Sequence, residues 1–175
     1  MRKILFLPTI GLLCFCIGCN NQKTGGTSAQ AQKNLDANHA ISKMFETGDF
    51  SKLGDYIADD AVDHAGMNGD IKGLNNIKDT LISYSKMASN MKNEVVKELA
   101  DDDYVMSWMK ESGTMNMDGM GMKAGDKYSW DIVEVSKFKN GKATDHWSFM
   151  SMNDMMKSMQ SMMQGMPMPM SSDNK

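Results

Sequence analysis

The sequence predicts an α+β domain in which helices come first along the chain and antiparallel strands follow. Up to residue 84, apolar residues recur every three or four positions, which is the period of an amphipathic helix. From residue 94 onward, segments rich in Val, Trp, Tyr and Phe alternate between apolar and polar residues and are separated by turn signals. A chain of 175 residues, 41% hydrophobic and 23% charged, fits one domain of this class.

The N-terminal residues are typical of an export signal. Arg2 and Lys3 precede an apolar stretch over residues 4–17, and polar residues follow it directly. This stretch is shorter than the ~20 residues of a membrane-spanning helix, and it contains Pro8. We therefore expect a signal peptide over residues 1–18 rather than a membrane span.

Residues 16–19, Cys-Ile-Gly-Cys, resemble a bacterial lipobox, with cysteine at a position where leucine is usual. The resemblance implies cleavage before Cys19 and lipidation of its sulfur; the alternative is an ordinary secretory signal cut nearby. Asn20 does not resemble the aspartate of an inner-membrane retention signal, so we expect a lipid anchor in the outer membrane of the cell envelope. The polar, unpatterned residues after Cys19 predict a flexible tether over 19–33.

The domain is expected over residues 34–150 and begins with helices. A first amphipathic helix is predicted over 34–45, and Gly48 ends it. A short helix follows over 49–56, then a short strand over 61–64, and a third helix over 73–84.

The second half of the domain is predicted to be a set of antiparallel strands. The strand patterns cover residues 94–99, 103–115, 122–138 and 142–150. Three turn signals separate them: Asp101-Asp102-Asp103, Asp118-Gly119 and Asn140-Gly141.

Five segments, in this order and spacing, carry a family resemblance. They are Ala40 to Val62, Asp63-His64, Lys72-Gly73, Tyr104 to Trp108, and Lys139 to Trp147. Together they resemble the SnoaL-like branch of the NTF2-like superfamily over about residues 35–150. The resemblance implies a cone, in which a curved antiparallel sheet wraps around helices and leaves a pocket between them. The family includes cyclases and isomerases as well as non-catalytic binding modules, so the resemblance does not decide whether this chain is an enzyme.

The same resemblance supplies candidate catalytic residues. In the family's cyclases an acid on the late strands, near a His-Trp pair, moves a proton next to a ketone, and Asp145 and His146 match that segment. Since neighbouring strand residues point to opposite faces, at most one of the two faces the pocket. His64 matches an early strand histidine of the family. The alternative for each histidine is a purely structural role, as a hydrogen-bonded residue of its strand. Trp108, Trp130 and Tyr84 are the expected pocket walls.

Methionine is the outlying component of the composition, with 21 of 175 residues. Around Asp118-Gly119 a two-residue turn predicts a hairpin that places four methionines on one face: Met115, Met117, Met120 and Met122. They are interpreted as a flexible apolar lid over the pocket, which is a common use of methionine. The alternative is a soft-donor site for Cu(I) or Ag(I) in an envelope protein.

A second methionine cluster follows the domain, in residues 151–175. Met152, Met155, Met156, Met159, Met162, Met163 and Met166 form one stripe of a predicted amphipathic helix, and the Pro-containing tail after it is expected to be disordered. Three partners fit the stripe: the domain's own sheet, a second copy of the chain in a homodimer, and the membrane surface.

Net charge and the absence of known motifs exclude several classes of partner and cofactor. A net charge of −3 without a long basic run excludes nucleic acid as an expected partner. The three histidines are scattered, and no phosphate loop or nucleophile motif is present, so no zinc, iron or other cofactor is indicated. The sequence therefore predicts a membrane-anchored lipoprotein whose pocket binds a small, mainly apolar molecule, with cyclase-like or isomerase-like proton transfer as the activity if it is an enzyme.

Overall fold

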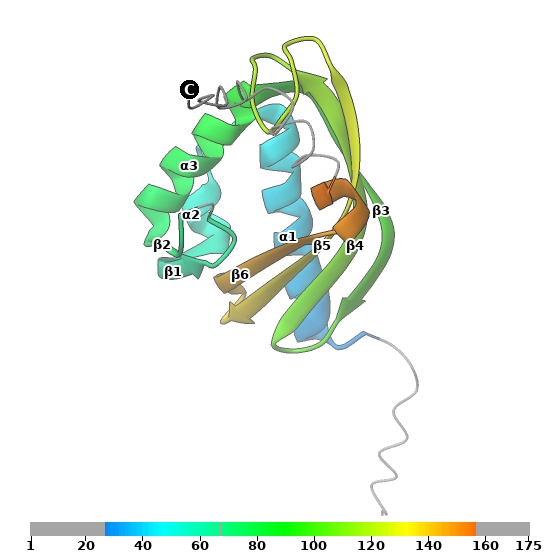
Figure 1. Ribbon diagram of the computed structural model, residues 1–175. Helices are drawn as coiled ribbons and strands as arrows, with labels where there is room; N and C mark the ends of the chain where they lie inside the picture. Colours follow the sequence, from blue (N-terminus) through cyan, green and yellow to red (C-terminus); the bar gives the residue numbers. More distant parts are fainter. Residues whose placement is uncertain (1–26, 67, 157–175) are drawn as a thin grey trace, which may run out of the picture.

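The computed structural model describes residues 27–66 and 68–156, and the elements follow the predicted order (Figure 1). The helices are α1 (Ala29–Thr47), α2 (Leu53–Tyr56) and α3 (Leu74–Met87). The strands are β1 (Ile57–Asp63), β2 (Ile71–Lys72), β3 (Ala88–Ala100), β4 (Tyr104–Met115), β5 (Lys127–Lys139) and β6 (Lys142–Met150). The predicted α+β class is confirmed.

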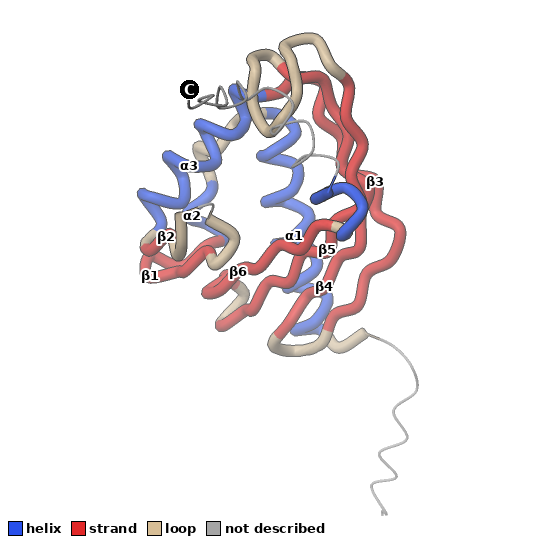
Figure 2. Tube along the Cα trace, in the orientation of Figure 1, coloured by secondary structure: helices blue, strands red, loops and turns tan. Residues whose placement is uncertain are grey.

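The strands form a single six-stranded sheet in the order β2-β1-β6-β5-β4-β3. All neighbours are antiparallel except β1 and β6, which run parallel. The sheet is strongly curved and wraps around α1, while α3 lies across the open side of the curve (Figure 2). This arrangement is the predicted cone.

Helix α1 is fixed at both ends by residues of the expected type. The hydroxyl of Ser28 accepts a hydrogen bond from the backbone N–H of Ala31, which caps the N-terminus. Gly48 ends the helix in the left-handed conformation, with φ of 71°. The helix begins earlier than predicted, so residues 29–33, assigned to the tether from their composition, are helical.

The first turns of α1 are held against the turn between β3 and β4. The side-chain amide of Asn34, which is fully buried, donates to the backbone oxygens of Asp101 and Asp102 at 3.3 and 3.0 Å. Ser28 also contacts the side chain of Asp102. These polar contacts set the depth at which α1 enters the cone, because a buried amide without partners would be costly.

The main hydrophobic core lies where the helices meet the sheet. Its buried members come from all three helices, the loop between α1 and α2, and strands β1, β4, β5 and β6: Ala37, Phe50, Leu53, Ile57, Ala61, Ile77, Val105, Phe138 and Ala143. Burial of these side chains is the main source of stability.

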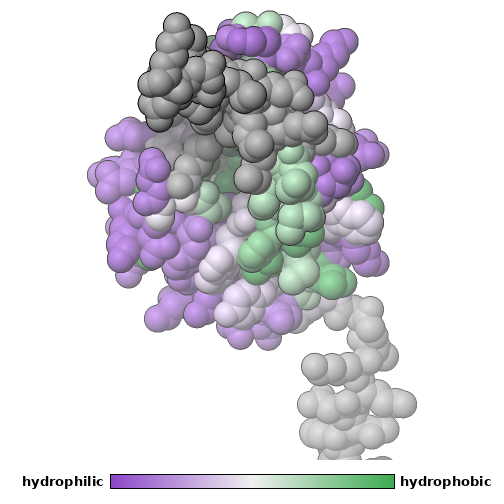
Figure 3. All heavy atoms as spheres, viewed as in Figure 1, coloured by the Kyte–Doolittle hydropathy of each residue, from purple (hydrophilic) through white to green (hydrophobic). Residues whose placement is uncertain are grey.

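The outer face of the sheet is rich in exposed hydrophobic side chains. They come from β3, β4 and β6: Val96, Leu99, Tyr104, Met106, Trp108 and Phe149. Figure 3 shows hydrophobic residues gathered over the strands in the lower right of the view.

Only the first part of the predicted methionine stripe lies within the described residues, and there it is not packed against the domain's own sheet. Residues 152–156 form a helical turn whose buried Asp154 accepts hydrogen bonds from the hydroxyl of Ser151 and the backbone N–H of Asp131. Met152, Met155 and Met156 are exposed. The first turn is thus attached through its polar residue rather than through its methionines. The other members of the stripe lie outside the described residues.

The predicted signal peptide, Cys19 and most of the tether also lie outside the described residues. None of the helices within residues 27–66 and 68–156 is both long and apolar enough to cross a membrane.

Candidate active site

A cavity of about 310 Å³ lies inside the cone, between the inner face of the sheet and helices α1 and α3. Most of its lining is apolar and includes Ile41, Phe45, Ile77, Leu81, Met91 and Trp130. A cavity of this size and character is typical of a small-molecule site.

Strand alternation explains which side chains reach the cavity. Val105, Met109 and Met115 of β4 are buried on the inner face, and Glu111 lies in the same phase. On β5, Tyr128 and Trp130 begin the inward series. Polar residues that share the inward-facing positions of these strands, such as Glu111 and Tyr128, therefore line the mainly apolar cavity.

His146 and Asp63 form a hydrogen-bonded pair in the cavity wall. Their strands, β6 and β1, run parallel and place the two residues directly beside each other. The Nδ1 atom of His146 lies 2.9 Å from Oδ1 of Asp63. This contact leaves Nε2 of the imidazole as the nitrogen that a ligand could engage.

The surroundings favour the charged form of both partners. Burial alone would lower the pKa of His146, but its hydrogen bond to Asp63 and the charges of Glu134 and Asp63 raise that pKa above the ordinary value. Burial likewise opposes ionisation of Asp63, yet the hydrogen bond and charge of His146 hold the pKa of Asp63 below its ordinary value.

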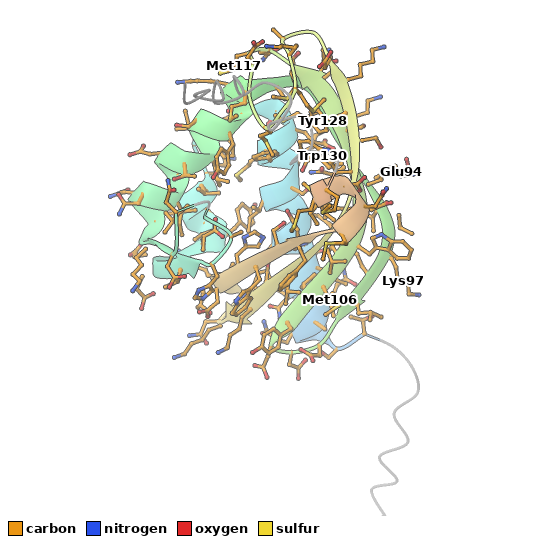
Figure 4. The ribbon with its side chains drawn as sticks, in the orientation of Figure 1. Glu94, Lys97, Met106, Met117, Tyr128 and Trp130 are labelled. Carbon is orange, nitrogen blue, oxygen red and sulfur yellow. The ribbon has the colours of Figure 1, made fainter. Side chains whose placement is uncertain are left out.

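A second polar group, Glu111 with Tyr128, lies elsewhere in the cavity lining. The hydroxyl of Tyr128 donates to Oε1 of Glu111 at 3.2 Å, and the rings of Tyr128 and Trp130 stack with centroids 4.2 Å apart (Figure 4). Gly113 makes room for this arrangement, because a Cβ there would lie 2.7 Å from the Tyr128 hydroxyl oxygen. Burial and the charge of Glu134 raise the pKa of Glu111 from 4.5 to about 7.

Further polar contacts join α1 to the inner face of the sheet beside the cavity. The side-chain amide of Asn38 in α1 donates to the hydroxyl of Ser107 at 3.2 Å and accepts from the hydroxyl of Ser136 at 3.2 Å. Glu134 lies opposite Ser107 in the sheet and acts electrostatically on both His146 and Glu111.

Comparison with protein families identifies the domain. The family model described as SnoaL-like polyketide cyclase matches residues 35–160, which is more than half of the chain. The chain belongs to the SnoaL-like polyketide cyclase family. No curated protein matches the sequence.

Solved structures agree on the SnoaL-like fold. A SnoaL-like polyketide cyclase from Agrobacterium tumefaciens matches with a TM-score of 0.62 at 15% identity, covering 72% of this chain and 97% of its own. A putative SnoaL-like polyketide cyclase from a Jannaschia species matches with a TM-score of 0.67 at 10% identity, covering 76% and 95%. An LEH-like epoxide hydrolase from M. tuberculosis matches with a TM-score of 0.61 at 14% identity, covering 77% and 95%. At such identities these structures show the fold alone.

Of the predicted catalytic residues of this SnoaL-like domain, only His146 is paired inside the cone. His64 comes directly after Asp63, the last residue of β1, and its ring stacks on Trp147 with centroids 4.8 Å apart. An oxygen of Asp145 lies 3.5 Å from Nε2 of His64. Asp145 borders the cavity, but its carboxylate belongs to this cluster. The structure does not bring the three predicted residues together.

Of the three side chains predicted to line the pocket, two do so and one does not. Trp130 and Tyr84 line the cavity. The prediction was wrong for Trp108, which is 47% exposed on the outer face of the sheet. Trp108 is an even-numbered residue of β4, whereas the odd-numbered residues of that strand face inward.

The predicted methionine hairpin has a different register. Strand β4 ends at Met115 and β5 begins at Lys127, with Thr114 opposite Lys127. The tight turn is centred on Met120 and Gly121, both at positive φ, rather than on Asp118-Gly119. The prediction of a two-residue turn at Asp118-Gly119 was wrong. The carboxylate of Asp118 instead accepts hydrogen bonds from the backbone N–H of Ala124 and from Nζ of Lys123, within a longer loop.

This loop separates the four methionines. Met115 is 3% exposed and lines the cavity together with Met120. Met122 packs against the cluster around Met115, whereas Met117 is 47% exposed in the loop at the top of Figure 4. The single face of four sulfurs on which the copper or silver hypothesis depended is therefore absent from the described structure. In the described part of the chain no group of three or more His, Cys, Asp or Glu is placed to hold a metal ion.

Four residues of the site were not predicted from the sequence: Asp63, Glu111, Tyr128 and Glu134. A signal was present for Glu111 and Glu134, because each is a charged residue in phase with buried apolar residues of its own strand. For Asp63 no such signal existed, since its role depends on pairing with a strand that lies far away in the sequence.

Proposed function

We propose that this SnoaL-like domain binds a small, mainly apolar molecule in the cavity and carries out proton transfer on it. The observation that supports this most directly is the His146–Asp63 pair, held at 2.9 Å in the wall of an apolar cavity. Asp63 and Glu134 raise the pKa of His146, which favours its protonated form as a general acid toward a ligand oxygen such as that of a ketone. Asp63 orients the imidazole and stabilises its charge.

We expect replacement of His146 by glutamine, or of Asp63 by asparagine, to lower turnover about 100-fold, the usual contribution of a general acid. Native mass spectrometry of the protein from its own host would first identify the carried molecule, whose conversion is then followed by chromatography. His39→Gln is the matched control, because His39 is exposed and pairs only with Glu98 in the described structure. Full turnover in both the His146 and Asp63 variants would contradict the proposed chemistry.

The domain is further proposed to be held in the outer membrane by lipid on Cys19. The sequence of residues 1–19 supports this proposal, and the tether would join the domain at Ser28, beside the β3–β4 turn. The loop 116–126, which contributes Met120 to the cavity, lies at the other end of the cone (Figure 1). Anchoring would thus leave the cavity end away from the attachment point.

For the anchor, Cys19→Ala is expected to abolish incorporation of an alkyne-labelled palmitate and to release the protein from the membrane fraction. The measurement is in-gel fluorescence after coupling a dye to the alkyne, combined with density-gradient separation of inner and outer membranes. Unlabelled wild-type protein would show that the N-terminus is an ordinary secretory signal.

A further inference from the structure

The charges inside the cavity are not balanced. Its lining includes four carboxyl residues, Asp63, Glu111, Glu134 and Asp145, whereas the lining drawn from the described residues contains neither lysine nor arginine. His146 is the only basic side chain among them. The tyrosines Tyr84 and Tyr128 complete the titratable set.

Two of these carboxyl groups have a partner of opposite charge. Asp63 is paired with His146, and Asp145 with His64. Glu111 and Glu134 take part in no ion pair within the described residues. The one hydrogen bond of Glu111 among those residues comes from the neutral hydroxyl of Tyr128. The charge of Glu134 does act on His146, but no positively charged side chain is paired with Glu111 among the described residues.

The closeness of the two carboxyl groups disfavours ionisation of Glu111. Burial and the charge of Glu134 together raise the pKa of Glu111 to about 7. Such mutual repulsion between carboxyl groups is relieved by a positive charge placed between them. Among the described residues that line the cavity, His146 is the only basic group, and it is hydrogen-bonded to Asp63.

Aromatic side chains border the same region. Trp130 is the cross-strand neighbour of Glu111, on the same inner face. Its ring stacks on that of Tyr128, and both line the cavity. Aromatic faces beside carboxylates attract quaternary and other ammonium groups.

One more acceptor lacks a donor. Oδ1 of Asn93, another lining residue, is buried and has no hydrogen-bond partner among the described residues. The amide nitrogen of the same side chain donates to Ser42 at 3.0 Å. An unfilled buried acceptor is rare, and it adds to the excess of acceptors over donors in this cavity.

From this cluster of carboxylates, aromatic rings and an unfilled acceptor in a mainly apolar cavity, we infer that the ligand is an apolar amine or quaternary ammonium compound. Its cationic centre would lie beside Glu111 and Glu134, against Trp130. The inference rests on the proposed function in one respect, namely that the cavity is the binding site. Anionic ligands are disfavoured by the same charges.

Benzyltrimethylammonium and its uncharged isostere neopentylbenzene test this inference, because they share a shape and the charge of the first does not change with pH. Isothermal titration calorimetry should show at least tenfold tighter binding of the cation. Binding should also release protons near pH 7, detected as a heat that depends on the buffer, because the bound charge favours ionised Glu111.

Glu111→Gln and Glu134→Gln should each weaken binding of the cation while leaving the isostere unaffected. Glu94→Gln, at an exposed position of β3, is the matched control. Equal affinity for both probes, or tighter binding of the isostere, would overturn the inference while leaving the proposed apolar site intact. Failure of both probes to bind would overturn the inference and also count against the cavity as a binding site.

Discussion

Truncation of Leu53 to alanine is expected to lower the free energy of unfolding by about 2–5 kcal/mol. Leu53 is 0% exposed and belongs to the core cluster that joins the helices to the sheet. The substitution removes apolar area and leaves a cavity, and α2, with four residues, has little other means of attachment. Since domains of this size are stable by only about 5–15 kcal/mol, a loss at the upper end would leave much of the protein unfolded at 37 °C.

The measurement is urea denaturation followed by circular dichroism, with Leu99→Ala as the matched control. Leu99 is 60% exposed on the outer face of the sheet, so its truncation should change the free energy of unfolding by no more than about 0.5 kcal/mol. Equal losses at the two positions would mean that the outer face is buried in solution and that the core assignment is incomplete.

Much of the fold could be predicted from the sequence because its signals are local. Helical periodicity predicts α1 and α3, Gly48 ends α1 as expected, and Asn140-Gly141 forms the tight turn between β5 and β6 with both residues at positive φ. Helix and turn preferences act over a few residues, so a single sequence reveals them. The start of α1 was placed too late because residues 29–33 are helical without an apolar stripe.

The candidate site was only partly predictable because its chemistry depends on pairing between distant strands. His146 is visible as a strand residue of a familiar motif, but its partner Asp63 is 83 positions away and becomes a neighbour only through the parallel β1–β6 pair. The hairpin prediction was wrong for a related reason: a tight turn was possible at Asp118-Gly119 or at Met120-Gly121, and it forms at the second pair. Trp108 was predicted on the wrong face. Alternation shows which residues of a strand share a face, but the strands and helices packed around it decide which face is the inner one.

Replacement of Glu111 by glutamine is expected to stabilise the protein by about 3 kcal/mol above pH 8 and to have little effect near pH 4. The pKa of Glu111 rises from 4.5 in the unfolded chain to about 7 in the folded protein, and that difference corresponds to about 3 kcal/mol. Below pH 4.5 the carboxyl group is neutral in both states. Between pH 4.5 and 7 it ionises in the unfolded chain first, so the free energy of unfolding falls as the pH rises. Above pH 7 the buried charge is present in full.

Glutamine has the same shape, keeps the acceptor for the Tyr128 hydroxyl and carries no charge at any pH, so it removes this penalty alone. The comparison is the free energy of unfolding of wild type and variant from pH 4 to pH 9, since other titrating groups contribute equally to both and cancel. Glu94→Gln should give a difference without this pH dependence. A constant difference at position 111 would show that Glu111 is already compensated by a positive charge, and the cavity would then have no place for a cationic ligand beside it.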